Sequence, residues 1–139
     1  MIGVIDTSTS GLVAQRAHLD VIAGNIAMKD VTRDEHGRSA PYRRRVALFA
    51  SGDAPGSRAA PGVHVAAIQE DPAPFGLRWA PHHVDAIQGG ESKGYVRVSN
   101  VDYHTEMVNA MTAARAYEAN VTVMETTKRM AASTLRLLA

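Results

Sequence analysis

Histidines are the side chains of this sequence best suited to metal or acid–base chemistry. They occur at six positions, and only His82 and His83 lie close together. A protein zinc site needs several ligands at short, regular spacings, supplied by cysteine, histidine or carboxylate. The chain has no cysteine and no histidine set with such spacing, so the sequence predicts no metal centre.

Carboxylates and hydroxyls also lack the arrangement of an active site. Glu70 and Asp71 are adjacent, but neighbouring side chains on a strand point to opposite faces and do not act as a pair. Ser8 and Ser10 have no histidine and aspartate arranged to activate them. The glycine-rich phosphate-binding motifs and the H-E-x-x-H zinc motif are absent. We therefore predict a protein that is not an enzyme and that binds no cofactor.

Arg43, Arg44 and Arg45 form the densest basic run of the chain. Nucleic-acid-binding patches carry more charge than this, usually with aromatic residues among the cations, and the net charge of the chain is only +1. On an alternating strand, such a run is typical of an exposed edge whose charges discourage aggregation. We interpret the three arginines as an exposed strand edge of this kind.

Composition and hydropathy are those of an ordinary soluble domain. Hydrophobic residues make up 45% and charged residues 21% of a chain whose length is typical of one domain. No apolar run approaches the roughly 18 residues that a membrane-spanning helix needs. The first residues show no basic segment followed by a long apolar one, so we expect no cleavable secretory signal.

The last stretch of the chain, residues 102–139, is the element that must organise the rest, and it contains no glycine or proline. Two rows of side chains seven residues apart run along it, namely Met107, Ala114, Val121, Lys128 and Leu135, and beside them Ala110, Tyr117, Met124, Ala131 and Leu138. This pattern predicts an amphipathic helix with a coiled-coil-like seam. Asn100 and Asp102 offer side chains that could cap its N-terminus. The helix would be about 57 Å long, longer than the rest of the chain can cover.

A third row, formed by Val123, Met130 and Leu137, lies about 100° around the same helix. Small residues separate it from the other rows, namely Ala113, Asn120, Thr127 and Thr134. The apolar arc therefore covers about half of the circumference. Either this helix is buried against its own domain, or several neighbours pack on it, some of them from other subunits. The short chain favours the second alternative.

Lys128 is the single charge in the two seam rows. Its stem could pack in the seam while the ammonium reaches water, or it could form an ion pair that fixes the helix register. Asp6, Asp20 or an acidic group on an adjacent subunit would then be its partner.

Residues 2–27 form a second expected helix. Ile5, Leu12, Leu19 and Ile26 fall seven residues apart, and Ile22 lies beside them. Residues 6–11 lower the helix propensity, so we expect the first turns to fray without a partner. Amphipathic helices at both ends of one chain favour pairing with each other. We therefore expect a discontinuous terminal helical domain, residues 1–28 plus 100–139, with residues 29–99 inserted as a middle region.

The sequence of the middle region indicates short strands joined by long loops. Strands are indicated at residues 42–49, 62–69, 75–79 and 95–98 by alternation and by β-branched or aromatic content. Residues 51–61 form a connection rich in glycine and proline. These strands are too few and too short to form an independent sandwich or barrel. The expected fold is mainly α with a small β-rich insertion.

Short motifs along the chain resemble those of bacterial flagellar rod, hook and related axial proteins. The N-terminal helix contains Ser10-Gly11-Leu12 and Leu19-Asp20-Val21-Ile22-Ala23-Gly24-Asn25-Ile26-Ala27. Further motifs are Pro41-Tyr42-Arg43-Arg44-Arg45, Glu70-Asp71-Pro72-Ala73-Pro74-Phe75, Gly94-Tyr95-Val96-Arg97, Asn100-Val101, Glu106-Met107 and Arg115-Ala116-Tyr117-Glu118-Ala119-Asn120-Val121. In this order they resemble the flagellar basal-body rod protein family, most closely its C-type proximal rod branch.

The resemblance implies a mechanical function. Members of this family pair their terminal helices as an antiparallel coiled coil, and many subunits pack these helices into a helical tube. The chain would then be a structural subunit of the proximal rod, the drive shaft that crosses the periplasm, transmits torque and surrounds the export channel. It would be exported unprocessed through the flagellar type III apparatus.

The resemblance also implies partners. These are other copies of the chain, other flagellar rod proteins, the membrane-ring and rod-adaptor components at the base and, in transit, the export apparatus. Neither nucleic acid nor direct membrane insertion is expected. The expected assembly interface comprises Ile5, Leu12, Leu19, Ile22, Ile26, Met107, Ala114, Tyr117, Asn120, Val121, Val123, Met124, Lys128, Met130, Leu135, Leu137 and Leu138.

The alternative function is a helical adaptor or export-associated binding module without enzymatic activity. Such a module would also contain two amphipathic helices and no active site. It would form a closed dimer or bundle, whereas a rod subunit needs open, head-to-tail contacts.

Overall fold

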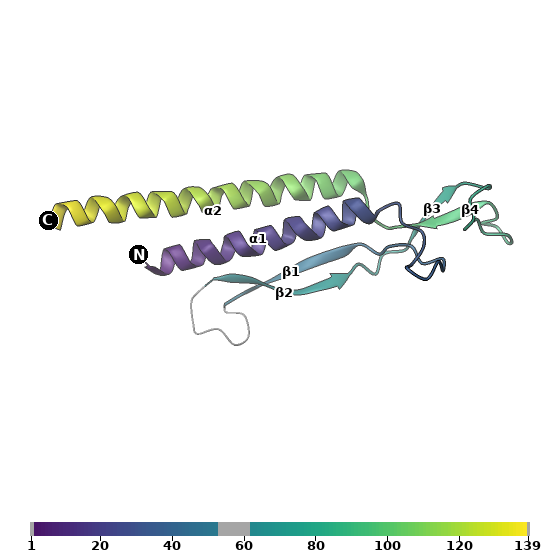
Figure 1. The fold of residues 1–139 in the computed structure, drawn as a ribbon, viewed down its shortest axis with the longest axis horizontal. Coiled ribbons are helices and arrows are strands. Elements are labelled where there is room, and N and C mark those ends of the chain that lie inside the picture. The colour runs from purple at the N-terminus through teal and green to yellow at the C-terminus, as the bar shows by residue number, and fades with distance from the viewer. Residues whose placement is uncertain (1, 53–61, 139) are drawn as a thin grey trace.

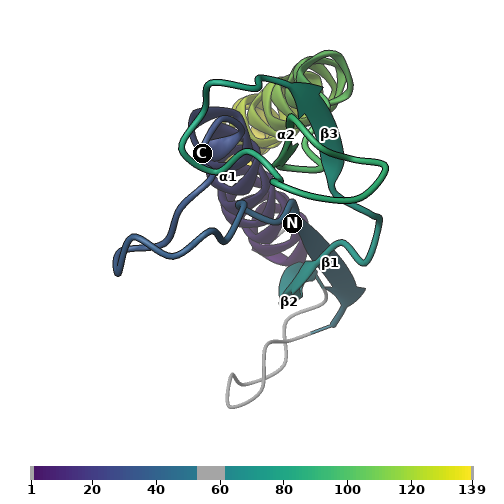
Figure 2. The same ribbon diagram turned by 90° about the vertical axis from the view of Figure 1, so that its right-hand side faces the viewer.

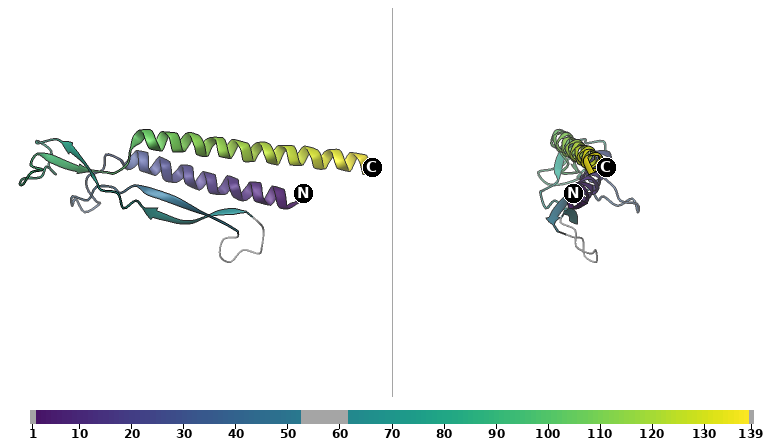
Figure 3. Two further views of the ribbon diagram at one scale, coloured as in Figure 1. Left: turned by 180° about the vertical axis from the view of Figure 1, so that it is seen from behind. Right: turned by 90° about the vertical axis from the view of Figure 1, so that its left-hand side faces the viewer.

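Two long helices dominate the computed structural model, which describes residues 2–52 and 62–138, except for the side chains of Ile2 and Leu138. Helix α1 spans Ile2–Met28 and helix α2 spans Tyr103–Leu138. They lie side by side and run in opposite directions, so both chain ends lie at the same end of an elongated molecule (Figure 1 and Figure 3). The fold is mainly α with a small β part, and neither of the two described helices contains an apolar stretch that could span a lipid bilayer.

The described residues between the two helices form four short strands. Strand β1 (Arg45–Ser51) pairs with β2 (Val63–Glu70), and β3 (Gly76–Trp79) pairs with β4 (Tyr95–Val98); both pairs are antiparallel. The sequence predicted each of them within a few residues, and β4 at its observed bounds. Part of the expected connection, residues 53–61, lies outside the described residues.

The β1–β2 hairpin depends on α1 for its stability, because an isolated two-stranded sheet is marginal in water. Helix α1 lies between this hairpin and α2 (Figure 1 and Figure 2). The hydroxyl of Ser10 accepts a hydrogen bond from the backbone N–H of Val63 at 3.1 Å. Farther along, the rings of His18 and Phe49 meet edge to face with centroids 5.4 Å apart. These neighbours on both sides explain why α1 is continuous from Ile2, although its first turns have low helix propensity.

Mostly small and polar side chains line the contact between α1 and α2, and Ile22 is the large apolar residue buried with them. The buried residues of α1 are Ser8, Gly11, Ala14, Ile22 and Asn25, and those of α2 are Glu106, Ala113 and Thr127. A Cβ added to Gly11 would lie 2.8 Å from the side-chain nitrogen of Asn120. Glycine therefore allows the two helices to approach closely at this point.

The two predicted seam rows consequently lie at the flanks of the helix contact. Met107, Val121 and Met124 are half-buried, whereas Lys128 and Leu135 are exposed. The row of small residues beside the seam rows permits a closer approach of α1 and lies at the centre of the contact. Lys128 forms no ion pair with a described residue, so its proposed pairing with Asp6 or Asp20 is absent from this chain.

The start of α2 is capped as the sequence predicted. The Asp102 carboxylate accepts hydrogen bonds from the backbone N–H groups of His104 (3.2 Å) and Thr105 (3.3 Å), and from the Thr105 hydroxyl (2.6 Å). The Thr105 hydroxyl and then these backbone groups hold the pKa of Asp102 below its usual value. Asn100, the other candidate cap, has a different role described below.

At its C-terminal end α2 extends past the first residue of α1 (Figure 1). It has 36 residues against 27 in α1, a difference of about 14 Å at 1.5 Å per residue. Met130, Leu135 and Leu137 in this part are 60%, 67% and 85% exposed. The described chain therefore leaves large apolar side chains uncovered there, as the length of the helix predicted.

Replacing Ile22 by alanine tests the contribution of the helix contact to stability. Ile22 is only 3% exposed, and truncating such a side chain leaves a cavity, so Ile22→Ala should lower the free energy of unfolding by about 2–4 kcal/mol. Ile68→Ala removes the same atoms from a side chain that is 54% exposed. This control should change the free energy of unfolding by less than about 1 kcal/mol. Urea titration followed by circular dichroism measures both; equal losses would contradict the assigned core.

Candidate functional site

A buried carboxylate joins the two helices to the strand region. Glu106, in the first turn of α2, is 1% exposed. Its Oε2 accepts a hydrogen bond from the Asn25 side chain at 2.9 Å, and its Oε1 accepts one from Arg44 Nε at 2.8 Å and forms an ion pair with Arg44 Nη2, also at 2.8 Å. A buried charge is costly unless it is paired and hydrogen-bonded, and both oxygens of this carboxylate are satisfied. We call the group formed by Asn25, Arg44, Asp71, Asn100 and Glu106 the polar junction.

Asn25 attaches the end of α1 to the start of β1. Its side-chain nitrogen donates to the carbonyl of Arg45 at 2.8 Å, and its oxygen accepts from the N–H of the same residue at 2.9 Å. The Tyr42 hydroxyl donates to that oxygen at 3.0 Å. The amide thus satisfies both backbone groups of Arg45, as a neighbouring strand would.

Asn100 performs the matching task ahead of α2. Its oxygen accepts the backbone N–H of Arg44 at 2.8 Å, and its nitrogen donates to the carbonyls of Asp71 and Ala73 at 3.3 Å each. Arg43 donates to the same two carbonyls, at 2.9 and 3.0 Å. The segment that leads into α2, the segment that leads into β1 and the turn after β2 are therefore held together at one place.

In the polar junction the cation Arg44 lies between two carboxylates, those of Glu106 and Asp71. Arg44 also donates to Asp71 at 3.1 Å. Burial alone would lower the pKa of Arg44, but the hydrogen bonds to Glu106 and Asp71 outweigh it and raise that pKa. The N–H of Ala73, and next the Arg44 guanidinium, lower the pKa of Asp71. Both groups are thus held in their charged forms.

The interpretation of Arg43, Arg44 and Arg45 as an exposed strand edge is wrong for the first two. They lie ahead of β1 at Arg45 and turn toward the helix ends, where Glu106 requires a counter-charge and the carbonyls after β2 require donors. Arg43 further lies over the Phe75 ring at 4.3 Å. One sequence signal could have identified the junction: Glu106 continues the small row of Ala113, Asn120 and Thr127, a position from which a charge cannot face water.

A second polar link ties two loops together beside β3 and β4. The side chain of Asp85 is 5% exposed. It accepts hydrogen bonds from Arg33 Nε at 2.9 and 3.0 Å and from the Thr32 hydroxyl at 3.0 Å, and it forms an ion pair with Arg33 Nη2 at 2.8 Å. The Arg33 guanidinium, as the strongest influence, lowers the pKa of Asp85. This link fixes the long loop after α1 to the loop between β3 and β4.

Helix α2 presents one exposed face without charge. Its side chains are apolar or carry only hydroxyls: Val108, Thr112, Ala119, Val123, Thr126, Met130 and Leu137 are all exposed. By helical periodicity Arg115 lies at one edge of this row, and the other charges fall farther around the helix, at Glu118, Glu125, Lys128, Arg129 and Arg136. We call this exposed row the uncharged face.

The residues expected at an assembly interface differ in their accessibility. Ile22 is buried within the chain. Half-buried are Ile5, Leu12, Leu19, Ile26, Met107, Ala114, Asn120, Val121 and Met124, and exposed are Tyr117, Val123, Lys128, Met130, Leu135 and Leu137. The side chain of Leu138 lies outside the described residues. The exposed members on the uncharged face, Val123, Met130 and Leu137, offer apolar surface to a partner.

Comparison with known proteins gives concordant matches along the chain. Residues 92–137 match the family described as flagellar basal body rod FlgEFG protein C-terminal. The flagellar basal-body rod protein FlgC of Yersinia enterocolitica is 40% identical, covering 99% of this chain and 97% of its own length. FlgC of Borreliella burgdorferi is 39% identical and FlgC of Bacillus subtilis 38%, each covering 96% of this chain and 95% of its own length.

Substitution of Glu106 tests the polar junction. Glu106→Gln removes the charge that pairs with Arg44 while keeping the shape, so the partly buried guanidinium loses a partner. We expect a loss of about 3 kcal/mol in the free energy of unfolding, since breaking a buried pair strands the remaining ion. Glu118→Gln, the same change at an exposed position of α2, should alter it by less than about 0.5 kcal/mol. Urea titrations measure both, and similar effects would refute the role of the junction.

His18 makes stability depend on pH. Burial is the main cause that lowers the pKa of His18 below 6.5. The charge of Arg44 lowers this pKa further, and the charge of Glu106 raises it in part. The stability that the neutral ring contributes is therefore complete above pH 6.5 and is lost as the pH falls through the folded-state pKa. His18→Gln should flatten the decline in the free energy of unfolding from about pH 7 to about pH 5. The same change at exposed His82 serves as control; a parallel decline in wild type and His18→Gln would contradict this origin.

Proposed function

The chain belongs to the family of flagellar basal-body rod proteins, as its motifs predicted, and we propose from this premise how it assembles. It is a structural subunit of the rod in the flagellar basal body and not an enzyme, and it assembles with other flagellar rod proteins. The alternative of a separate adaptor or binding module is not favoured.

We propose that the uncharged face of α2 is the main contact between rod subunits. Val108, Val123, Met130 and Leu137 are 45–85% exposed on it, and this exposure is the observation that carries the proposal. Apolar rows of this length on a soluble chain mark interaction surfaces. Because the charges of α2 lie at one edge of this face or beyond it, a neighbouring helix can pack on its apolar row while those charges stay in contact with water.

The terminal helices act as one unit in this proposal. Residues 1–28 and 100–139 form a discontinuous helical domain whose two helices pair as an antiparallel coiled coil, and residues 29–99 form the inserted middle region. The spacing of buried positions on α1 supports this: Ser8 and Ile22 fall on one heptad row, and Gly11 and Asn25 fall on the row three residues further on. The polar junction holds the insertion at one end of the pair.

Repetition of this contact in an open, head-to-tail manner would build a helical tube. The tube would form part of the proximal rod, cross the periplasm, transmit torque and surround the export channel. The exposed rows around Tyr117, Leu135 and Leu137 would contact other copies or other rod proteins, and the base of the rod would meet the membrane-ring and rod-adaptor components. The chain would reach this place through the flagellar type III apparatus without a cleavable signal.

Met130→Glu tests the uncharged face as an assembly contact. A carboxylate buried between subunits without a counter-charge is costly, so this variant should be exported at the normal level while rods fail to form. Electron microscopy of isolated basal bodies measures rod formation, and immunoblotting of exported protein measures transit.

Met111→Glu is the matched control, because Met111 is also exposed on α2 but lies on the side of Arg115 and Glu118. It should leave rods and swimming intact. Normal rods with Met130→Glu would refute the proposed contact, as would equal failure of the two variants.

A further inference from the structure

The β3–β4 pair carries an exposed apolar face at the end of the molecule farthest from the chain ends (Figure 1). Trp79 lies opposite Tyr95, and Leu77 lies opposite Arg97, all on one side of the two strands. Trp79 is 61% exposed and Leu77 53% exposed. We call this surface, together with Ile87 from the following loop, the ribbon face; none of its residues belongs to the helix rows that the proposed function uses.

Trp79 is held in place although most of its ring is open. Its ring lies against Gly94, where φ is +83° and an added Cβ would come 2.6 Å from the ring. The Tyr95 ring meets it edge to face at 5.0 Å. The backbone around Gly94 is fixed, because its N–H donates to the carbonyl of Ile87 at 2.9 Å and its own carbonyl accepts the N–H of Ala80 at 3.0 Å. Such a pre-positioned tryptophan is typical of the residues that dominate binding energy.

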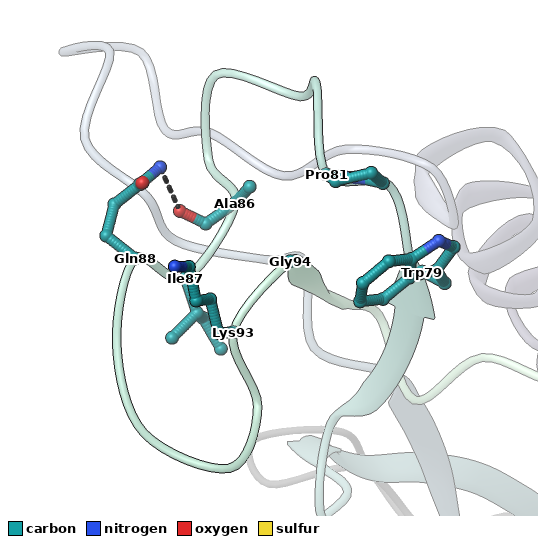
Figure 4. Close-up of a pocket in the computed structure, with 7 residues that line it drawn as sticks. All are labelled: Trp79, Pro81, Ala86, Ile87, Gln88, Lys93 and Gly94. Atoms are coloured by element: carbon teal, nitrogen blue, oxygen red, sulfur yellow. Dashed lines mark hydrogen bonds between the residues drawn. The ribbon is translucent and has the colours of Figure 1, made fainter.

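Two hollows beside Ile87 give the face its shape. In the first, of about 210 Å³, Trp79 and Pro81 lie across from Ile87 and Lys93 (Figure 4). The second, of about 370 Å³, is lined in part by Phe75, Leu77, Arg43 and Arg97. Each is lined mainly by apolar residues and has a volume suited to one large side chain of a partner, and cations are part of both linings, Lys93 in the first and Arg43 and Arg97 in the second.

The cations that line the hollows form no ion pair within the described part of the chain, and Arg43 acts on Asp71 only at longer range, where it helps to lower the pKa of that carboxyl. No described carboxylate lies within 4.0 Å of Arg43, Lys93 or Arg97. Interfaces place an apolar core inside a polar rim and match opposite charges across it. An apolar centre with a positive rim therefore favours apolar side chains flanked by carboxylates.

We propose that the ribbon face binds a segment of a different protein that presents apolar side chains flanked by Asp or Glu. A second copy of this chain is a poorer occupant. Its most exposed apolar end, around Leu135 and Leu137, is accompanied by Lys128, Arg129 and Arg136, which would meet the cations of the ribbon face with the same charge. The partner is therefore a protein other than this chain, and its contact lies apart from the α2 face.

The test uses Trp79 as its own probe, because the chain contains a single tryptophan. The full-length protein is titrated with a short synthetic peptide in which leucine and phenylalanine lie between glutamates, while Trp79 emission is recorded. A second peptide has lysine in place of each glutamate. We expect a blue shift with the glutamate peptide, and affinity at least about tenfold lower for the lysine peptide and at raised salt.

Variants separate the face from general attraction of charge. Arg97→Glu and Leu77→Ser each alter an exposed side chain and should weaken glutamate-peptide binding about tenfold, with unchanged circular dichroism. Arg115→Glu makes the same charge change on α2 and should leave binding as in wild type. The proposal is overturned if the two peptides bind equally or not at all, or if Arg115→Glu weakens binding as much as Arg97→Glu. An emission shift that follows the chain's own concentration without peptide would assign the face to a second copy instead.

Discussion

Burial of the Glu106 carboxylate is the constraint on which the arrangement of this protein depends. An ion removed from water requires compensation at each oxygen, and removal of either partner would leave a charge or a donor unsatisfied. The compensation comes from segments far apart in sequence: Asn25 at the end of α1 and Arg44 ahead of β1. The carboxylate therefore fixes where α1 ends, where β1 begins and how α2 starts. If any of these elements moved, the carboxylate or one of its partners would lose a hydrogen bond while still buried.

Because the polar junction aligns the two helices, they can pack closely through a contact made mostly of small side chains. Since polar anchors determine the alignment at one end, the rest of the α1–α2 contact can consist of small residues, and Gly11 faces Asn120 at close range. A contact between small side chains buries little apolar surface, so the large side chains of α2 remain at its flanks and on its uncharged face. This division suits a subunit whose helices complete their burial only by packing against neighbours.

The elongated shape separates two kinds of surface. The helix pair, with Met130 and Leu137, lies toward the chain ends, and the ribbon face, with Trp79 and Leu77, lies at the opposite end (Figure 1). Hydrogen-bonded and ionic links of short length connect them through the polar junction and through Asp85. Groups with defined geometry therefore connect the two surfaces, as the proposed torque-bearing role would require.

The sequence by itself determined the elements and the family. Heptad spacing, capping at Asp102 and strand alternation predicted both helices and the four strands, because these are local properties of a chain. It did not determine which row of α2 faces α1, since Met107, Ala113 and Val123 all lie on rows that could be covered. Nor did it reveal that Arg44 turns inward to Glu106, sixty-two residues away. Only the tertiary structure decided these points, because burial of a side chain depends on which distant segment lies beside it.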